Sequence, residues 1–206
     1  MILEGLVTTC DAAGGVHVAA MGPWIDDAER IAGPIRRLTL RPFAASQTAA
    51  NLARIPEGVF HVTDDVLLLA RVVAGAAGPQ PAARPATHVR GWLLGDACTA
   101  YEFAIAAADR TAERDRLDAA VVATHQCRPF LGFNRAAHAV IEAAILVTRL
   151  HLPQAVNPRP TLQALEPLVA KTGGPREREA FAVLCRAAED RWQPGPEMTT
   201  AVRPRL

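Results

Sequence analysis

Polar side chains of a kind that binds phosphate gather in one short segment. Residues 40–52 contain a guanidinium, two hydroxyls and an amide, from Arg41, Ser46, Thr48 and Asn51. An Arg fork supplies paired N–H donors, hydroxyls add further donors, and a helix N-terminus offers free backbone N–H groups with a favourable dipole. These residues also fit a simpler interpretation, in which Ser46 only caps a helix, Arg41 makes a surface ion pair and Asn51 is solvated.

A second segment repeats the tripeptide Arg-Pro-Phe, at residues 128–130. Arg128, Asn134 and Arg135 flank Gly132 and two phenylalanines, at the start of another predicted helix. The segment fits either a second anion site or a main-chain turn held by its aromatic side chains.

A third candidate is Met21-Gly22-Pro23, which precedes Trp24 at the end of a predicted strand. A Gly-Pro step exposes main-chain groups beside apolar side chains. A flat heteroaromatic ring needs that combination of apolar faces and a few edge hydrogen bonds. On its own, the segment is also typical of an ordinary turn with core side chains.

Strong nucleophile and metal patterns do not stand out in the sequence. The cysteines, Cys10, Cys98, Cys127 and Cys185, are far apart and predict free thiols. His125 and Cys127 could supply two metal ligands, but a site needs further ligands from elsewhere, and we expect no metal. We therefore expect a phosphate-bearing cofactor to carry the chemistry.

Composition narrows the classes of partner. The chain has 206 residues, 22 basic and 21 acidic, so its net charge of +1 gives no reason to expect nucleic acid or an anionic membrane. The longest apolar run, residues 139–148, contains Glu142 and is too short to span a bilayer. The N-terminus lacks the basic start and long apolar stretch of a signal peptide. We expect a cytoplasmic protein.

The first half of the chain predicts mostly strands. Short apolar or alternating runs indicate strands at 2–9, 16–21, 35–40, 59–62, 89–94, 100–107 and 117–123, the first two forming a hairpin. Helices are expected at 46–54, with Ser46 as N-cap, and at 66–73. Residues 74–87, rich in Gly, Ala and Pro, predict a long loop.

The second half predicts helices. Asn134 can cap a helix that runs to Leu150, whose polar residues form one narrow stripe: Arg135, His138, Glu142 and Arg149. So much apolar surface suggests packing against both the sheet and a second subunit, and therefore a homodimer. Amphipathic helices are expected at 162–171 and 176–192.

Strands followed by helices, without βαβ alternation or a GxGxxG motif, favour an α+β fold with an antiparallel barrel over a Rossmann sheet. We expect a barrel over residues 1–125, a helical subdomain over 126–192 and a flexible tail over 193–206.

Long collinear motifs give the chain a resemblance to the DUF447 family. They cover about residues 2–190 and include Ile2–Gly5, Ala20–Gly22, Leu40–Phe43 with Ser46–Thr48 and Asn51, Thr63–Asp65, Arg128–Ala136, Val140–Ala144, Thr148–Leu150 and Lys171–Pro175.

The resemblance implies an antiparallel split β-barrel that binds FMN, related to flavin reductases, with a C-terminal helical subdomain and a homodimeric habit. In such relatives, the segment matching Arg41 to Asn51 holds the FMN phosphate, and the segment matching Met21 to Pro23 lies beside the ring. The relatives often carry Asn where this chain has His61. Some members come from organisms that use tetrahydromethanopterin in one-carbon chemistry.

Together, these observations predict an FMN-binding flavoprotein of the reductase type, with a small-molecule electron donor or acceptor. The FMN-binding residues would be Met21, Gly22, Pro23, Arg41, Ser46, Thr48, Asn51, Arg128 and Asn134. The alternative is a non-catalytic FMN-binding or storage module, with a link to tetrahydromethanopterin metabolism. His61 is either a packed strand histidine or a proton donor to the flavin or substrate.

Overall fold

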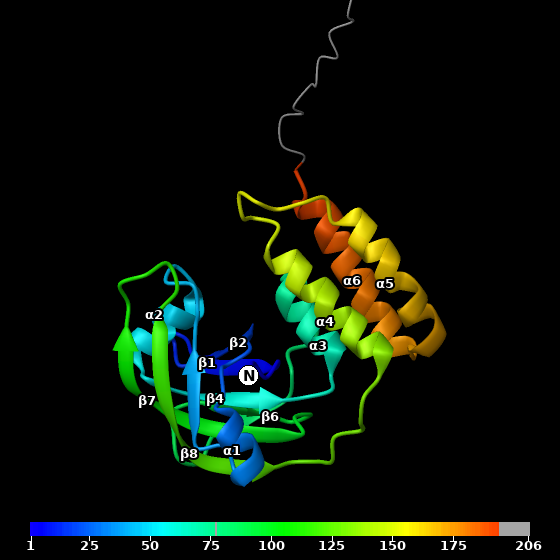
Figure 1. Ribbon diagram of the computed structural model, residues 1–206. Helices are drawn as coiled ribbons and strands as arrows, with labels where there is room; N and C mark the ends of the chain where they lie inside the picture. The colour runs from blue at the N-terminus through cyan, green and yellow to red at the C-terminus, as the bar shows by residue number, and fades with distance from the viewer. Residues whose placement is uncertain (77, 194–206) are drawn as a thin grey trace, which may run out of the picture.

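A computed structural model describes residues 1–76 and 78–193 of the chain. The tail expected to be flexible lies outside these residues, except for Gln193. The chain forms a curled antiparallel sheet with a helical bundle beside it (Figure 1). The α+β architecture predicted from the sequence is therefore confirmed.

The sheet has six strands in the order β2-β1-β4-β7-β8-β3, and every neighbouring pair is antiparallel. The strands are β1 (Leu6–Cys10), β2 (Val16–Ala20), β3 (Arg37–Leu40), β4 (Glu57–Val62), β7 (Thr99–Asp109) and β8 (Arg116–Gln126). The predicted hairpin of β1 and β2 is present, with Leu6 opposite Ala20 and Cys10 opposite Val16.

Trp24 connects the edge strand β3 with the segment that precedes β1. Trp24 bridges Thr39 of β3 on one side and Ile2, just before β1, on the other. The backbone N–H of Trp24 donates to the Thr39 carbonyl oxygen at 2.8 Å, and the Thr39 N–H donates back at 2.9 Å. Among the described residues, only isolated bridges, and no continuous ladder of strand pairs, join β3 to the segment before β1. The barrel is therefore split at this place.

Every second side chain along the strands points into the barrel, and these side chains fill it. Side chains from several strands meet in one buried cluster that includes Val7, Leu38, Phe60, Phe103 and Leu117. Two short strands, β5 (Ala83–Pro85) and β6 (Trp92–Leu94), form a separate antiparallel hairpin. This hairpin covers the other face of the sheet, where Leu93 packs with Val59 and Ala100.

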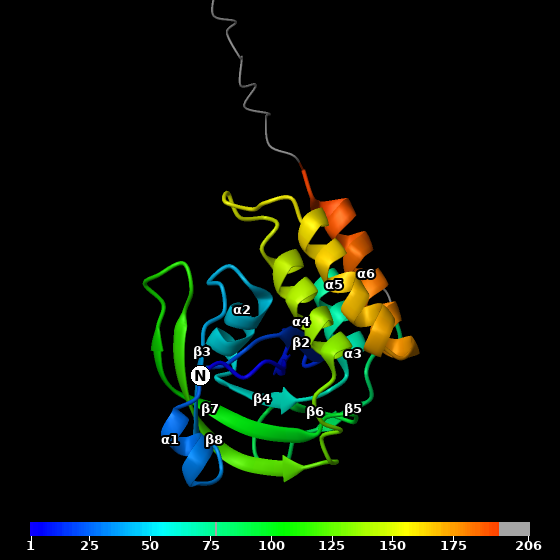
Figure 2. The same cartoon turned by 45° about the vertical axis from the view of Figure 1, so that its right-hand side comes forward.

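Four helices make the bundle: α3 (Val66–Ala74), α4 (Arg135–Thr148), α5 (Arg159–Thr172) and α6 (Pro175–Arg191). Two shorter helices belong to the barrel side, α1 (Asp27–Ala32) and α2 (Gln47–Arg54). Figure 2 shows α4 on the side of the bundle that faces α2.

The bundle accounts for part of the apolar surface of α4. The helices α3, α5 and α6 of the same chain pack against it, and Leu6 of β1 belongs to the same buried cluster. Ala139, Val140 and Ala143 are all buried in this way. Ile141, Ile145 and Leu146 of α4 are only partly buried in the single chain, and the homodimer stays a prediction.

Differences from the predicted elements are local. The loop expected at 74–87 contains β5, and α1 lies where no helix was predicted, because six residues with one apolar turn carry little periodicity. In the part of the chain that the structure describes, no helix is long and apolar enough to cross a membrane.

Candidate functional site

The turn after β3 is built by main-chain contacts with the tip of the β7–β8 hairpin. The N–H of Ala44 donates to the Glu113 carbonyl oxygen at 2.9 Å, and the N–H of Asp115 donates to the Pro42 carbonyl oxygen at 3.0 Å. Arg114 Nη1 donates to the Arg41 carbonyl oxygen at 3.1 Å. The hairpin tip therefore holds the Arg41 segment in place and adds a second guanidinium beside it.

Arg41 has no ion pair or side-chain hydrogen bond among the described residues, and it is exposed. Burial lowers the pKa of Arg114; Glu113 acts in the opposite direction, and the nearby positive charges of Arg149 and Arg41 lower it further. Three guanidinium groups thus lie near one another with Glu113 as the acidic group beside them, and this excess of positive charge favours an anion.

Aromatic contacts fix Arg114 in this cluster. Its guanidinium carbon lies 3.6 Å from the centre of the Phe43 ring, a cation–π contact. Phe43 also contacts His151, with ring centres 5.7 Å apart in an edge-on arrangement. His151 follows α4, so the helical part of the chain reaches the barrel at this point.

The N-terminus of α2, which follows Arg41 by a few residues in the sequence, carries neutral donors. Ser46 is the N-cap, as predicted, and its hydroxyl accepts the Ala49 N–H at 3.2 Å. Among the described residues, the backbone N–H groups of Gln47 and Thr48 have no acceptor. The first turn of α2 therefore presents two unsatisfied N–H groups of the type that binds phosphate oxygens.

Thr48 and Asn51 are buried and hold α2 against the first hairpin. Thr48 Oγ1 lies 3.3 Å from His17 Nε2 on β2, and Asn51 Nδ2 donates to Thr9 Oγ1 on β1 at 2.9 Å. Asn51 Oδ1 accepts from Gln47 Nε2 at 2.8 Å. These contacts position the helix, while a direct contact of either side chain with a cofactor stays a prediction.

A groove of about 720 Å³ lies beside Arg41, over the outer face of β3 and β8. Thr39 and Ala120 are among its lining residues, and the half-exposed Trp24 is another. Two other arginines that line the groove have carboxylate partners, since Arg37 pairs with Glu29 and Arg116 pairs with Asp118. Arg41 has no ion pair with any residue that the structure describes. The volume suits a drug-sized or nucleotide-sized ligand.

The segment Met21–Pro23 lies close to this groove without lining it. The Met21 N–H donates to the Gly5 carbonyl oxygen, and the Pro23 carbonyl oxygen accepts from Leu3. Because the next residue, Trp24, pairs with Thr39 two residues before Arg41, the predicted ring segment and the predicted phosphate segment lie near each other. The Gly22 N–H has no acceptor among the described residues.

Gly22 also lies against the chain's first residues. A Cβ there would lie 2.5 Å from Ile2 Cγ2 and 3.0 Å from Glu4 Oε2. Partial desolvation raises the pKa of the Glu4 carboxyl, Glu142 raises it further and Arg149 opposes the change. The charges of Glu4, Glu142 and Arg149 therefore lie near one another, and they bring the Gly22 turn close to α4 and to the residue that follows it.

Arg128, predicted as a second anion ligand, is occupied by protein partners. Its guanidinium forms a two-pronged ion pair with Asp64 and donates to the carbonyl oxygens of Asp96 and Pro129. Arg128 lowers the pKa of Asp64 to about 2, and the N–H of Leu131 donates to the same carboxylate. The ion pair ties the entry of α4 to the segment that follows β4.

Asn134 is likewise engaged, as the N-cap of α4. Its Oδ1 accepts from Ala136 and Ala137, and its Nδ2 donates to the Thr172 carbonyl oxygen at 3.1 Å. Arg128 and Asn134 line a separate cavity of about 490 Å³ that shares no lining residue with the groove beside Arg41. The structure therefore does not bring the two Arg-Pro-Phe segments into one site.

His61 is fully buried on β4. Its Nε2 accepts the Leu94 N–H at 3.1 Å, so the proton of the neutral ring lies on Nδ1, which donates to the Leu6 carbonyl oxygen at 3.3 Å. Burial lowers the pKa of His61 to about 4. These contacts favour the packed strand histidine of the two interpretations.

Sequence reasoning missed two neighbours of the segment that begins at Arg41: Arg114, which contacts Arg41, and His151, which contacts Phe43. They lie 73 and 110 positions further along the chain and follow no spacing rule relative to it. Only the register of the β7–β8 hairpin and the course of the chain after α4 bring them there.

Two family models together match most of the chain. Residues 3–128 match the N-terminal domain described as a protein of unknown function (DUF447), and residues 134–186 match the part described as protein of unknown function (DUF447). The chain therefore belongs to the DUF447 family, which confirms the resemblance of its motifs. No curated protein matches it.

Solved structures support the same fold. The FMN-bound protein MM1853 from Methanosarcina mazei, of the DUF447 family, has a TM-score of 0.74 at 20% identity, over 90% of this chain and 94% of that one. The styrene monooxygenase flavin reductase of Pseudomonas putida S12 has a TM-score of 0.51 at 12% identity, over 62% and 82% of the two chains. Flavin reductase HpaC, complexed with NADP⁺, has a TM-score of 0.51 at 13% identity, over 65% and 82%. The fold is that of the flavin reductase-like split barrels.

Proposed function

We propose that this protein binds FMN, with the phosphate held between Arg41 and the N-terminus of α2. The observation that carries the proposal is the guanidinium of Arg41, which has no ion pair among the described residues, followed six and seven positions later by the acceptor-free N–H groups of Gln47 and Thr48 at the start of α2. The FMN in the similar structure of the Methanosarcina mazei family member supports the choice of ligand.

The donor set fits a phosphate dianion. Arg41 offers a charged fork, Arg114 adds a second positive charge nearby, and two backbone N–H groups at the start of α2 are further donors. Trp24, which pairs with Thr39, offers an aromatic face to the flavin ring. The Gly22 N–H, two residues earlier, offers a hydrogen-bond donor to the edge of that ring. A flavin, when bound, accepts or donates a hydride or single electrons.

The chain's own residues then bind, orient and shield. Arg41 and the first turn of α2 hold the phosphate, and the contacts of Thr48 and Asn51 keep α2 in position. His61 keeps a neutral ring and links β1 to β6, so it is not an imidazolium acid that could donate a proton at neutral pH. We infer a reductase-type flavoprotein that exchanges electrons with a small-molecule donor or acceptor and works as a homodimer.

Parallel titrations with FMN and riboflavin test the binding. We expect FMN to bind far more tightly, because only FMN carries the phosphate. Equal affinities would contradict the phosphate site, and absence of binding to both would contradict the flavin function.

Stopped-flow mixing then tests the reductase function. The FMN-loaded protein is reduced with NADH or NADPH, and candidate acceptors are mixed with the reduced sample. Reduction and reoxidation faster than for free FMN support electron transfer. Rates no faster than those of free FMN would instead support the storage module.

A further inference from the structure

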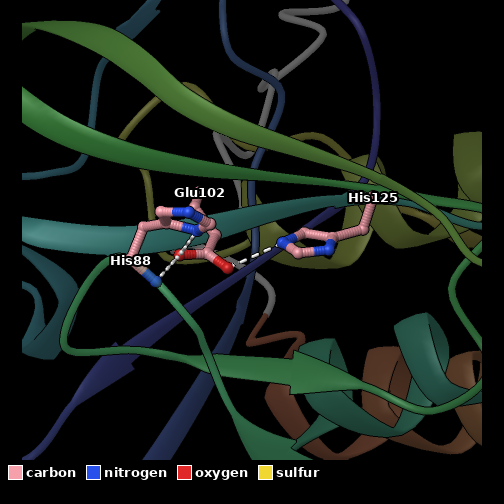
Figure 3. A group of neighbouring side chains, drawn as sticks. All are labelled: His88, Glu102 and His125. Carbon is pink, nitrogen blue, oxygen red and sulfur yellow. Dashed lines mark hydrogen bonds and ion pairs between the residues drawn. The ribbon is translucent and has the colours of Figure 1, made fainter.

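A second group of chemically active side chains lies on the opposite face of the sheet from the barrel core. His88, Glu102 and His125 each offer one ligand atom, and these atoms lie within 4.8 Å of one another. Figure 3 shows the carboxylate of Glu102 between the two imidazoles. None of the three lines the groove beside Arg41, so the group is independent of the proposed FMN site.

Three separate segments supply the group. Glu102 lies on β7, and His125 lies on β8 opposite Ala100, which places it diagonal to Glu102 on the same face. His88 lies in the loop between β5 and β6, which passes over this face. The group therefore joins the short hairpin to the main sheet.

Glu102 is fully buried but strongly hydrogen bonded. It accepts the backbone N–H groups of Thr87, His88 and Val89, at 2.9, 2.6 and 3.1 Å, and the Thr87 hydroxyl at 2.9 Å. Burial alone would raise the pKa of Glu102, but these bonds and the contact with His125 lower it to about 2. Glu102 is thus a fixed, ionised carboxylate.

The two imidazoles complete a possible ligand set. His125 Nε2 lies 2.7 Å from Glu102 Oε1, and His88 Nδ1 lies 3.7 Å from Glu102 Oε2. Transition metal ions bind imidazole nitrogen and carboxylate oxygen at about 2.0–2.2 Å, so one ion placed among the three atoms can reach them all after small side-chain rotations. The backbone donors to Glu102 would then act as the outer partners that orient a metal-binding carboxylate.

We propose that His88, Glu102 and His125 bind one divalent transition metal ion of the Zn²⁺ type, which clips the β5–β6 hairpin to the sheet. Two nitrogens and one carboxylate suit ions of this class better than Mg²⁺ or Ca²⁺. On binding, the proton of His125 moves from Nε2 to Nδ1. The proton of His88 moves from Nδ1, where it bonds to the Thr87 hydroxyl at 2.8 Å, to Nε2, and the ion takes the place of both protons. The side chain of His88 is 59% exposed, so solvent can fill the remaining coordination positions.

Calorimetric titration of the metal-free full chain, carrying no polyhistidine tag, with Zn²⁺ tests the proposal. We expect one ion per chain, and a loss of affinity of about tenfold or more in His88→Ala and in His125→Ala. His138→Ala, which removes another exposed histidine, is the matched control and should bind as the wild type does. Excess Zn²⁺ should raise the melting temperature of the wild type and the control only.

Because the His88 side chain is largely exposed, its removal tests metal binding without disturbing the packing of the protein. Its removal leaves the hydrogen bonds of Glu102 to the loop backbone intact, so His88→Ala should fold normally in the absence of metal. A wild-type isotherm without saturable binding would overturn the proposal. Unchanged Zn²⁺ affinity in both His88→Ala and His125→Ala would overturn it as well.

Discussion

The two Arg-Pro-Phe segments of this chain have the same local sequence and opposite electrostatic surroundings. Arg41 projects from the end of β3 without an ion pair among the described residues, whereas Arg128 is held by both oxygens of Asp64. Each segment leads into a helix with a polar N-cap, Ser46 in one case and Asn134 in the other. The difference shows that an arginine near the start of a helix is a candidate anion ligand only when it forms no ion pair with a carboxylate of the protein.

The aromatic residues of the two segments differ in the same way. Phe43 packs between Arg114 and His151, inside the charge cluster. Phe130 and Phe133 contact each other edge-on, and Phe133 is 90% exposed together with Leu131 at 87%. One segment is therefore integrated into the barrel, while the other offers an exposed apolar surface at the entry of α4.

The largest effect that separates the two segments is expected in FMN affinity. Arg41→Ala should weaken FMN binding by about 1.5–3 kcal/mol, or roughly ten- to hundred-fold, since it removes a charge-assisted contact. Riboflavin binding should barely change. Fluorescence titration measures both, with Arg135→Ala as the control for net charge. Equal loss for FMN and riboflavin would place Arg41 outside the phosphate site.

Acid should destabilise the two regions in different pH windows. The unfolded chain protonates His61 near pH 6.5 and the folded one near pH 4, so stability falls by about 3 kcal/mol as the pH drops through that range. The pKa of Asp64 is about 2 when folded, below its usual 3.8, so its contribution is present above pH 4 and is lost on further acidification.

Matched variants assign the two windows. His61→Asn should remove much of the upper step, and Asp64→Asn should remove part of the lower step, which Glu102 shares. Urea unfolding at a series of pH values measures both. An undiminished upper step in His61→Asn would show that another group, such as His17, causes it.

The free energy of unfolding should decrease when the ion pair of Arg128 with Asp64 is removed, and it should change little when Arg41 is replaced. Asp64→Ala leaves the Arg128 guanidinium without its carboxylate and should cost about 1–2 kcal/mol, since the pair is only partly buried. Arg128→Ala should cost a similar amount, and the double variant should cost less than the sum. Thermal unfolding measures these changes. If Arg128→Ala selectively weakens FMN over riboflavin, the phosphate lies at the second segment instead.

The smallest effects are expected at the two N-caps. Asn134→Ala should destabilise the protein by about 1 kcal/mol or slightly more, because Asn134 caps two N–H groups and also bonds Thr172. Ser46→Gly should cost only a few tenths of a kcal/mol in stability. Ser46→Gly should weaken FMN if the hydroxyl contacts the phosphate. Unfolding and FMN titration of both variants compare the two caps directly.

Strong periodic patterns allowed most elements to be predicted. The hairpin of β1 and β2, the Ser46 cap of α2 and the Asn134 cap of α4 all lie where local pattern and capping chemistry indicated. The predicted strands within β7 and β8 were too short, since their ends extend beyond the core as a hairpin with polar residues. Such ends carry no apolar alternation from which their length could be inferred.

The sequence by itself determined the α+β order of the chain, the caps of two helices and the residue types that could hold a phosphate, because these depend on local propensity and short spacing. Tertiary structure decided which arginine stays free, which neighbours join it and which helices cover α4. Asp64 neutralises Arg128 from 64 positions away, and Arg114 reaches Arg41 across 73. Contacts over such separations depend on strand register and helix packing, which no local pattern encodes.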